Sequence, residues 1–199
     1  MKITLKEIAF SACIAFLILI SPLFIYHKIT HMNKDDLAWL NIYKGRDTVL
    51  FRCNQFATDT LMMYEKYIMN SLSPFNFGFF ETSDDEYIAH GIIHMILMHQ
   101  GQKLYGYFYI FKEENRSPVR HNILFGDRYL EYYHERLRIV RIGQKVYDDC
   151  IIVDDSNSEF GYVEKETEKR IKKFVWSKSE GLLWYNCNDS IYIKVANKQ

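Results

Sequence analysis

The chain has 199 residues, and its 25 lysines and arginines balance 25 aspartates and glutamates, so the formal net charge is zero. A neutral chain has no long-range field that would collect phosphate backbones, which argues against a general nucleic-acid binder. The 15 Tyr and 14 Phe beside only nine Gly and three Pro favour strands, because flat side chains pack well on a pleated sheet.

Four cysteines are present, one of them, Cys13, within an apolar N-terminal segment. The other three are Cys53, Cys150 and Cys187, and none belongs to a C-x-x-C pair. This spacing argues against a closed zinc site and allows at most one intramolecular disulfide. We expect three small buried hydrophobes and no cofactor.

The first predicted element is the uncharged segment Ile8 to Tyr26, IAFSACIAFLILISPLFIY. As a helix it would extend about 28 Å, close to the hydrocarbon thickness of a bilayer. Signal peptidase requires small residues just after the apolar run, whereas residues 24–28 are bulky. Residues 1–28 are therefore predicted to be an uncleaved signal anchor, a single-pass transmembrane helix.

The flanking charges bear on the orientation of this anchor. Lys2 and Lys6 precede it, which favours an extracytoplasmic position for the following domain, while Lys28 and Lys34 oppose that orientation. We predict that the domain lies on the extracytoplasmic side of the membrane.

Residues 29–46 are predicted to form a juxtamembrane connector with a short helix capped by Asn33. The remaining residues, 47–199, show short apolar runs separated by turn residues, without long helices between them. This pattern predicts a mainly β domain, an antiparallel meander folded as a curved sheet, sandwich or open barrel. The expected strands are 47–53, 59–69, 87–99, 103–111, 119–125, 128–133, 137–142, 146–153, 170–177, 181–187 and 190–195.

The strand at 103–111 is apolar on both faces. Alternation sends one set of side chains, Tyr105, Tyr107, Tyr109 and Phe111, to a single face. Such a strand is either covered on both sides or lines a cavity. If the Tyr/Phe face is concave, it could hold an apolar ligand such as a lipid or a peptide, so these four residues are the predicted ligand-binding set.

His90 and His94 form the second candidate site. On a strand, residues four apart lie about 13 Å from each other, too far to bind one metal ion directly. On a helix they would be adjacent, as in H-E-x-x-H zinc hydrolases, but Gly91 stands in place of the general base. Ordinary strand histidines are the favoured interpretation. A metal-dependent hydrolase with Asp84 or Glu86 as acidic partner is the alternative.

An acidic stretch at 155–159 begins like a calcium loop. Phe160, however, occupies the position at which such a loop requires glycine for its sharp turn. We therefore predict a solvated loop at this place.

Two C-terminal segments carry a resemblance. Residues 146–153 read VYDDCIIV, and residues 174–185 read FVWSKSEGLLWY, with Gly181 suited to a positive φ. They resemble the closing strands of small exported bacterial β-sheet proteins of unknown function, often lipoproteins, in which a Y-x-D/N-C/V-I/L-x-V strand precedes an aromatic-S/A-K-x-x-G-L-V-x-Y hairpin. The resemblance implies a fold and brings no catalytic residue. The chain departs from the lipoproteins in having a spanning segment in place of a lipidated cysteine.

The leading hypothesis from sequence is thus a membrane-anchored envelope protein with a non-enzymatic binding or structural domain. Its expected partners are the membrane and an apolar ligand or a protein, and no nucleic acid. No nucleophile motif or phosphate loop occurs in the sequence.

Overall fold

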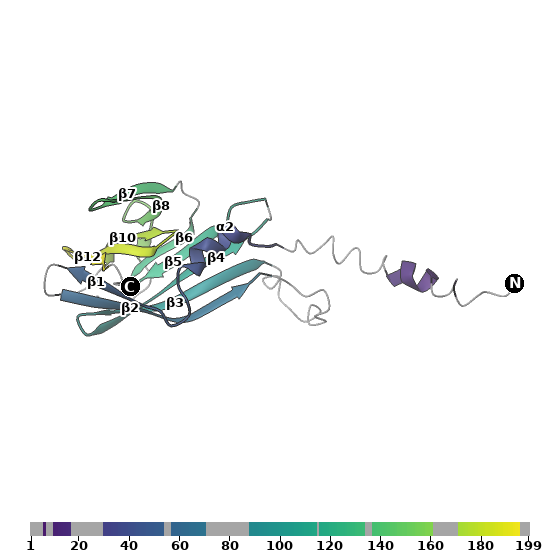
Figure 1. Ribbon diagram of the computed structural model, residues 1–199, viewed down its shortest axis with the longest axis horizontal. Coiled ribbons are helices and arrows are strands. Elements are labelled where there is room, and N and C mark those ends of the chain that lie inside the picture. Colours follow the sequence, from purple (N-terminus) through teal and green to yellow (C-terminus); the bar gives the residue numbers. More distant parts are fainter. Residues whose placement is uncertain are drawn as a thin grey trace.

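The computed structural model describes residues 6, 10–16, 30–53, 57–70, 88–114, 116–133, 137–160 and 171–195. Their strands form a single antiparallel sheet that curls into a half-barrel (Figure 1). The strands are β1 (Thr48–Cys53), β2 (Ala57–Met69), β3 (Ala89–His99), β4 (Gln102–Lys112), β5 (Arg120–Phe125), β6 (Arg128–Tyr133), β7 (Arg138–Ile142), β8 (Lys145–Val153), β9 (Glu159–Phe160), β10 (Ile171–Ser177), β11 (Gly181–Cys187) and β12 (Ser190–Lys194).

The strand order across the sheet is β7-β8-β10-β11-β12-β1-β2-β3-β4-β5-β6-β9. The prediction of a mainly β, antiparallel, curved sheet is confirmed, and each strand expected from the sequence is present with its ends shifted by no more than two residues. The short strand β9 was not predicted, because two residues carry no periodicity. In the turn between β3 and β4, Gln100 and Gly101 have positive φ values of 46° and 81°.

Helix α2 (Lys34–Asn41) lies inside the curl, against β3 and β4 (Figure 1). Asn33 caps it as predicted: its side chain accepts from the Asp36 amide, and the Asp36 carboxylate accepts in return from the Asn33 amide. The stretch expected to be a connector thus supplies Trp39 and Leu40 to the core of the sheet. At Gly91 a Cβ would lie 2.3 Å from Leu40 Cδ1, so a glycine allows the helix to approach β3 this closely.

Three stacked rings lie at the centre of the interior. Phe108 of β4 stacks on Trp176 of β10 with centroids 4.4 Å apart, and on Trp39 of the helix at 5.8 Å. Tyr43 follows the helix and accepts a hydrogen bond from the Leu182 amide at 3.0 Å. Its hydroxyl lies where a side chain at Gly181 would stand, and Gly181 has the predicted positive φ, 75°.

The two ends of the curl meet where the β5–β6 turn approaches the start of β10, although β6 and β10 are not hydrogen-bonded neighbours in the sheet. Asp127 accepts from the Ile171 amide at 3.0 Å, and buried Arg128 donates to the carbonyls of Ile171 and Lys172 at 3.1 and 3.0 Å. Arg128 also pairs with Asp155 at 2.6 Å. We call the contacts that Asp127 and Arg128 make with the main chain of β10 the clasp.

No helix among the described residues is both long and apolar enough to cross a bilayer. Within the predicted anchor at 8–26, only residues 10–16 are described, and they are helical. The remainder of that prediction lies outside the described residues.

Arg128→Ala is expected to lower the free energy of unfolding by about 3 kcal/mol, because it removes charged hydrogen bonds and leaves buried carbonyls without a donor. Urea denaturation measures the change. The matched control is Arg120→Ala, which removes a partly exposed ion pair with Glu113 and should cost less than about 1 kcal/mol. Equal losses for the two variants would contradict the importance of the clasp.

Candidate functional site

The predicted ligand-binding residues of β4 lie on the outer face of the sheet. Phe108 and Ile110 point inward and are fully buried, so alternation places Tyr105, Tyr107 and Tyr109 on the opposite side. Tyr105 is 56% exposed, whereas Phe111 at the end of the strand is buried. The Tyr/Phe face is therefore the convex face of the sheet, because α2 and the interior rings lie on the concave side. Ligand binding by these residues stays a prediction.

The histidines of β3 lie on this same outer face, between tyrosines of the neighbouring strands. The His94 ring is stacked against Tyr64 of β2 at 5.6 Å and meets Tyr107 of β4 at 6.4 Å. The His90 ring lies between Tyr67 at 5.8 Å and Tyr109 at 5.9 Å. The sequence predicted the two groups as separate candidate sites, and strand pairing brings them together. We call the set the aromatic face: Tyr64, Tyr67, His90, His94, Tyr105, Tyr107, Tyr109 and Phe111.

This arrangement suits ring contacts better than metal binding. His90 and His94 are separated by Ile92 on the same face, and the His90 Nδ1 is already bonded to the Ile88 carbonyl at 2.8 Å. In the described part of the chain, no group of three or more His, Cys, Asp or Glu side chains is placed to hold a metal ion. The proposed acidic partners Asp84 and Glu86 lie outside the described residues.

The aromatic face continues across β5 to β6. Tyr107 is paired in register with Leu124 of β5, and Leu124 with Tyr129 of β6. The hydroxyls of Tyr107 and Tyr129 are hydrogen-bonded, and burial is the main reason that the pKa of Tyr107 is raised. One row of side chains thus runs from Tyr64 on β2 to Tyr129 on β6.

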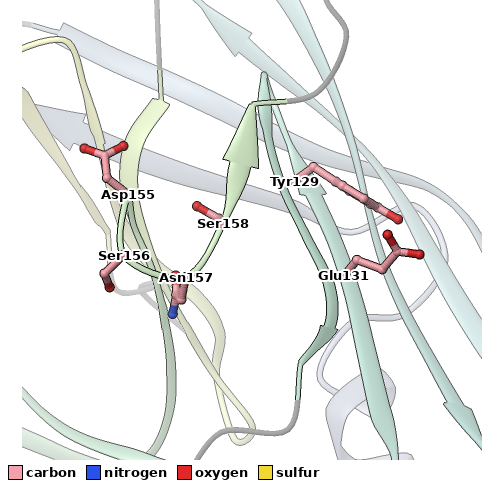
Figure 2. Close-up of a pocket in the computed structure, with 6 residues that line it drawn as sticks. All are labelled: Tyr129, Glu131, Asp155, Ser156, Asn157 and Ser158. Atoms are coloured by element: carbon pink, nitrogen blue, oxygen red, sulfur yellow. The ribbon is translucent and has the colours of Figure 1, made fainter.

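The row ends at a pocket of about 350 Å³ between β6 and the loop that joins β8 to β9. Its lining is polar and consists of Tyr129, Glu131, Asp155, Ser156, Asn157 and Ser158 (Figure 2). In Figure 2 the side chains of Tyr129 and Glu131 extend to one side of β6, while the Asp155 carboxylate points away from them. The pocket therefore offers the exposed Glu131 carboxylate beside a phenol hydroxyl, while the second exposed carboxylate of the lining, Asp155, is paired with Arg128.

The loop at 154–158 is held together by its own side chains. The Asp154 carboxylate accepts from the Ser156 hydroxyl at 2.6 Å and pairs with Lys173 at 2.9 Å, and these contacts lower the pKa of Asp154 to about 2. The Asp155 carboxylate forms an ion pair with Arg128, and the Asn157 side-chain amide donates a hydrogen bond to the Ile152 carbonyl. The side chains of this loop, which resembled a calcium loop only at its start, thus stabilise the turn and the clasp, and they do not converge on one point.

A second polar cluster, which the sequence did not reveal, lies inside the sheet at the end that carries the β3–β4 turn. His99 of β3 is bonded through Nδ1 to Asp59 of β2 at 2.5 Å, and its Nε2 lies 3.5 Å from the sulfur of Cys187 on β11. The Tyr185 hydroxyl donates to the same Asp59 oxygen. Asp59, His99 and Cys187 each expose only 2% of their surface.

The hydrogen bond to Asp59 is the largest influence on His99, followed by that to Cys187. Together they raise the pKa of His99 to about 9, against the opposing effect of burial. Burial and Asp59 likewise raise the pKa of Tyr185. The folded chain therefore holds a proton on His99 in a place that solvent barely reaches.

This tighter proton binding predicts a pH-dependent stability. The contribution of His99 is fully present below the unfolded pKa of about 6.5 and is lost as the pH rises through the folded value of about 9. The free energy of unfolding should fall by roughly 1 to 3 kcal/mol over that interval. Urea denaturation across this pH range measures the fall, which should be smaller in His99→Gln. A stability that rises with pH in the native chain would refute the prediction.

No protein-family model matches the chain, and comparisons with curated proteins and with solved structures also gave no match.

Proposed function

We propose that the chain is a non-enzymatic binding domain whose aromatic face and adjoining pocket hold a short extended peptide. The observation that carries this proposal is the continuous row of side chains from Tyr64 to Tyr129, ending at the pocket that contains Glu131. Exposed tyrosine and histidine rings combine apolar area with hydrogen-bonding groups, which is typical of protein interfaces.

The dimensions favour a peptide over a second copy of the domain. The row crosses five neighbouring strands, which are about 4.8 Å apart, so it is about 19 Å long. Along the strands, His90 to His94 spans about 13 Å, and the patch covers on the order of 250 Å². A stable dimer buries about 800 Å² on each partner, whereas a six-residue extended segment is about 20 Å long.

The polarity of the row gives the peptide a direction. Its β2 end presents Tyr64 and Tyr67, each 48% exposed, and its β6 end presents the Glu131 carboxylate. A ligand with apolar side chains along the rings and a lysine or arginine at the end beside Glu131 would match both.

A random hexapeptide library displayed on phage, selected on the purified full-length chain, tests this proposal. We expect the enriched sequences to be apolar with one basic end. Synthetic copies should bind at least tenfold more weakly to Tyr107→Ala and to Glu131→Gln, because these substitutions remove the central ring and the terminal charge.

The control is Ile139→Ala on β7, a 73% exposed apolar residue that belongs neither to the aromatic face nor to the lining of the pocket. It should bind the same peptides as the native chain does. Failure to enrich any sequence would end the proposal, as would peptides that bind all three variants equally.

We further propose that residues 8–26 anchor this domain in a membrane, with the domain on the extracytoplasmic side. The support is the sequence itself, an uncharged apolar segment about as long as a bilayer is thick. The aromatic face would then act beside a lipid surface. The metal-dependent hydrolase has no supporting observation in the geometry of His90 and His94.

Carbonate extraction of membranes tests the anchor. The native chain should remain in the membrane pellet, and the double variant Leu17→Lys with Leu19→Lys should move to the supernatant, since each lysine costs about 3 kcal/mol in a spanning helix. The same positions changed to isoleucine serve as the control and should stay in the pellet. A native chain recovered in the aqueous fraction would overturn the anchor and leave the peptide site untouched.

A further inference from the structure

In the buried cluster of Asp59, His99 and Cys187, a carboxylate, an imidazole and a thiol follow one another in contact, which is the arrangement that activates a cysteine nucleophile. Nδ1 of the imidazole is held by a carboxylate at 2.5 Å, and Nε2 faces the sulfur at 3.5 Å. In cysteine nucleophiles the carboxylate orients the ring, and the ring takes the thiol proton. Here three strands, β2, β3 and β11, supply one group each.

The surroundings of the sulfur favour a charge-separated pair. The ionisable groups that interact with it are His99, Tyr185 and Tyr192, and Asp59 is bonded to the other nitrogen of the His99 ring. Only His99 among them becomes cationic, and a cationic imidazole stabilises a neighbouring thiolate. The Tyr192 ring packs edge-on against His99 at 5.1 Å, and the Asp59 contact fixes which nitrogen faces the sulfur.

We propose that Cys187 is a peroxide-reactive thiol, activated by His99 and Asp59, whose substrate is a small uncharged hydroperoxide. The size limit follows from burial, because Cys187 and His99 each expose only 2% of their surface. The proposal is independent of the peptide site, which lies on the outer face of the sheet.

The reaction balances within the cluster and one peroxide molecule. The reactive state is the pair of a Cys187 thiolate with the protonated His99 ring, whose Nε2 carries the proton. The thiolate attacks one peroxide oxygen, forming an S–O bond as the O–O bond breaks. The departing hydroxide takes the proton from Nε2 and leaves as water. Sulfur loses two electrons, peroxide gains them, and the product is a sulfenic acid beside neutral His99.

The chain contains a matched control for this thiol. Cys150 is also free and is fully buried, but its neighbour is a carboxylate, Asp149, in place of an imidazole. Burial and that negative charge raise the pKa of Cys150 to about 12. The two thiols thus have similar exposure and opposite electrostatic surroundings.

The test treats the native full-length chain with hydrogen peroxide, alkylates the remaining thiols and quantifies each cysteine by peptide mass spectrometry. Cys187 should oxidise at least tenfold faster than Cys150. A disulfide of Cys187 with Cys53 counts as the same event, because it forms from the sulfenic acid with loss of water. In His99→Gln, shown by circular dichroism to be folded, the rate at Cys187 should fall to that of Cys150.

Equal oxidation rates of Cys187 and Cys150 in the native chain would overturn the proposal, and this comparison needs no variant. A folded His99→Gln chain that keeps the fast rate would also overturn it, because the difference would then come from access alone. If His99→Gln does not fold, Asp59→Asn takes its place and should slow Cys187 at least threefold.

Discussion

The clasp of Asp127 and Arg128 on β10 is the interaction on which the rest of the fold depends. β6 and β10 share no ladder, so side chains take the place of main-chain pairing: a carboxylate accepts from one amide, and a guanidinium donates to two carbonyls. An open sheet would expose its inner face to water. With the ends held together, Phe108 of β4 and Trp176 of β10 meet and stack inside the curl.

Closing the curl also decides which face of the sheet remains open to solvent. The inner face is occupied by Trp39 and Leu40 of α2, by the stacked rings and by the buried pair of Lys112 with Asp36 at 2.5 Å. Among the described residues, the inner face is thus lined by the packed core. The tyrosines of β4 are therefore outside, where they have lateral neighbours on β2 and β3, and a chain of rings replaces the expected cavity.

The local features of the fold could be predicted from the sequence, because alternation and turn residues act over a few positions. The positive φ value at Gly181 and the cap at Asn33 are examples. The curl direction could not be predicted, since β4 is apolar on both faces and either face could line the interior. The cluster of Asp59, His99 and Cys187 was equally hidden, because its members are separated by 40 and 88 positions along the chain and only the strand order brings them together.

The three histidines of β3 lie on two different faces of the sheet, because side chains alternate between the faces along a strand. His90 and His94 occupy half-exposed positions and contact tyrosine rings from both neighbouring strands. His99, an odd number of residues further on, points inward and meets a carboxylate and a thiol. A slip of one residue in the pairing of β3 would exchange these environments, placing two imidazoles in the core and Cys187 beside no base. The pairing register of β3 therefore determines both the ring contacts of His90 and His94 on the outer face and the contacts through which His99 binds its proton in the core.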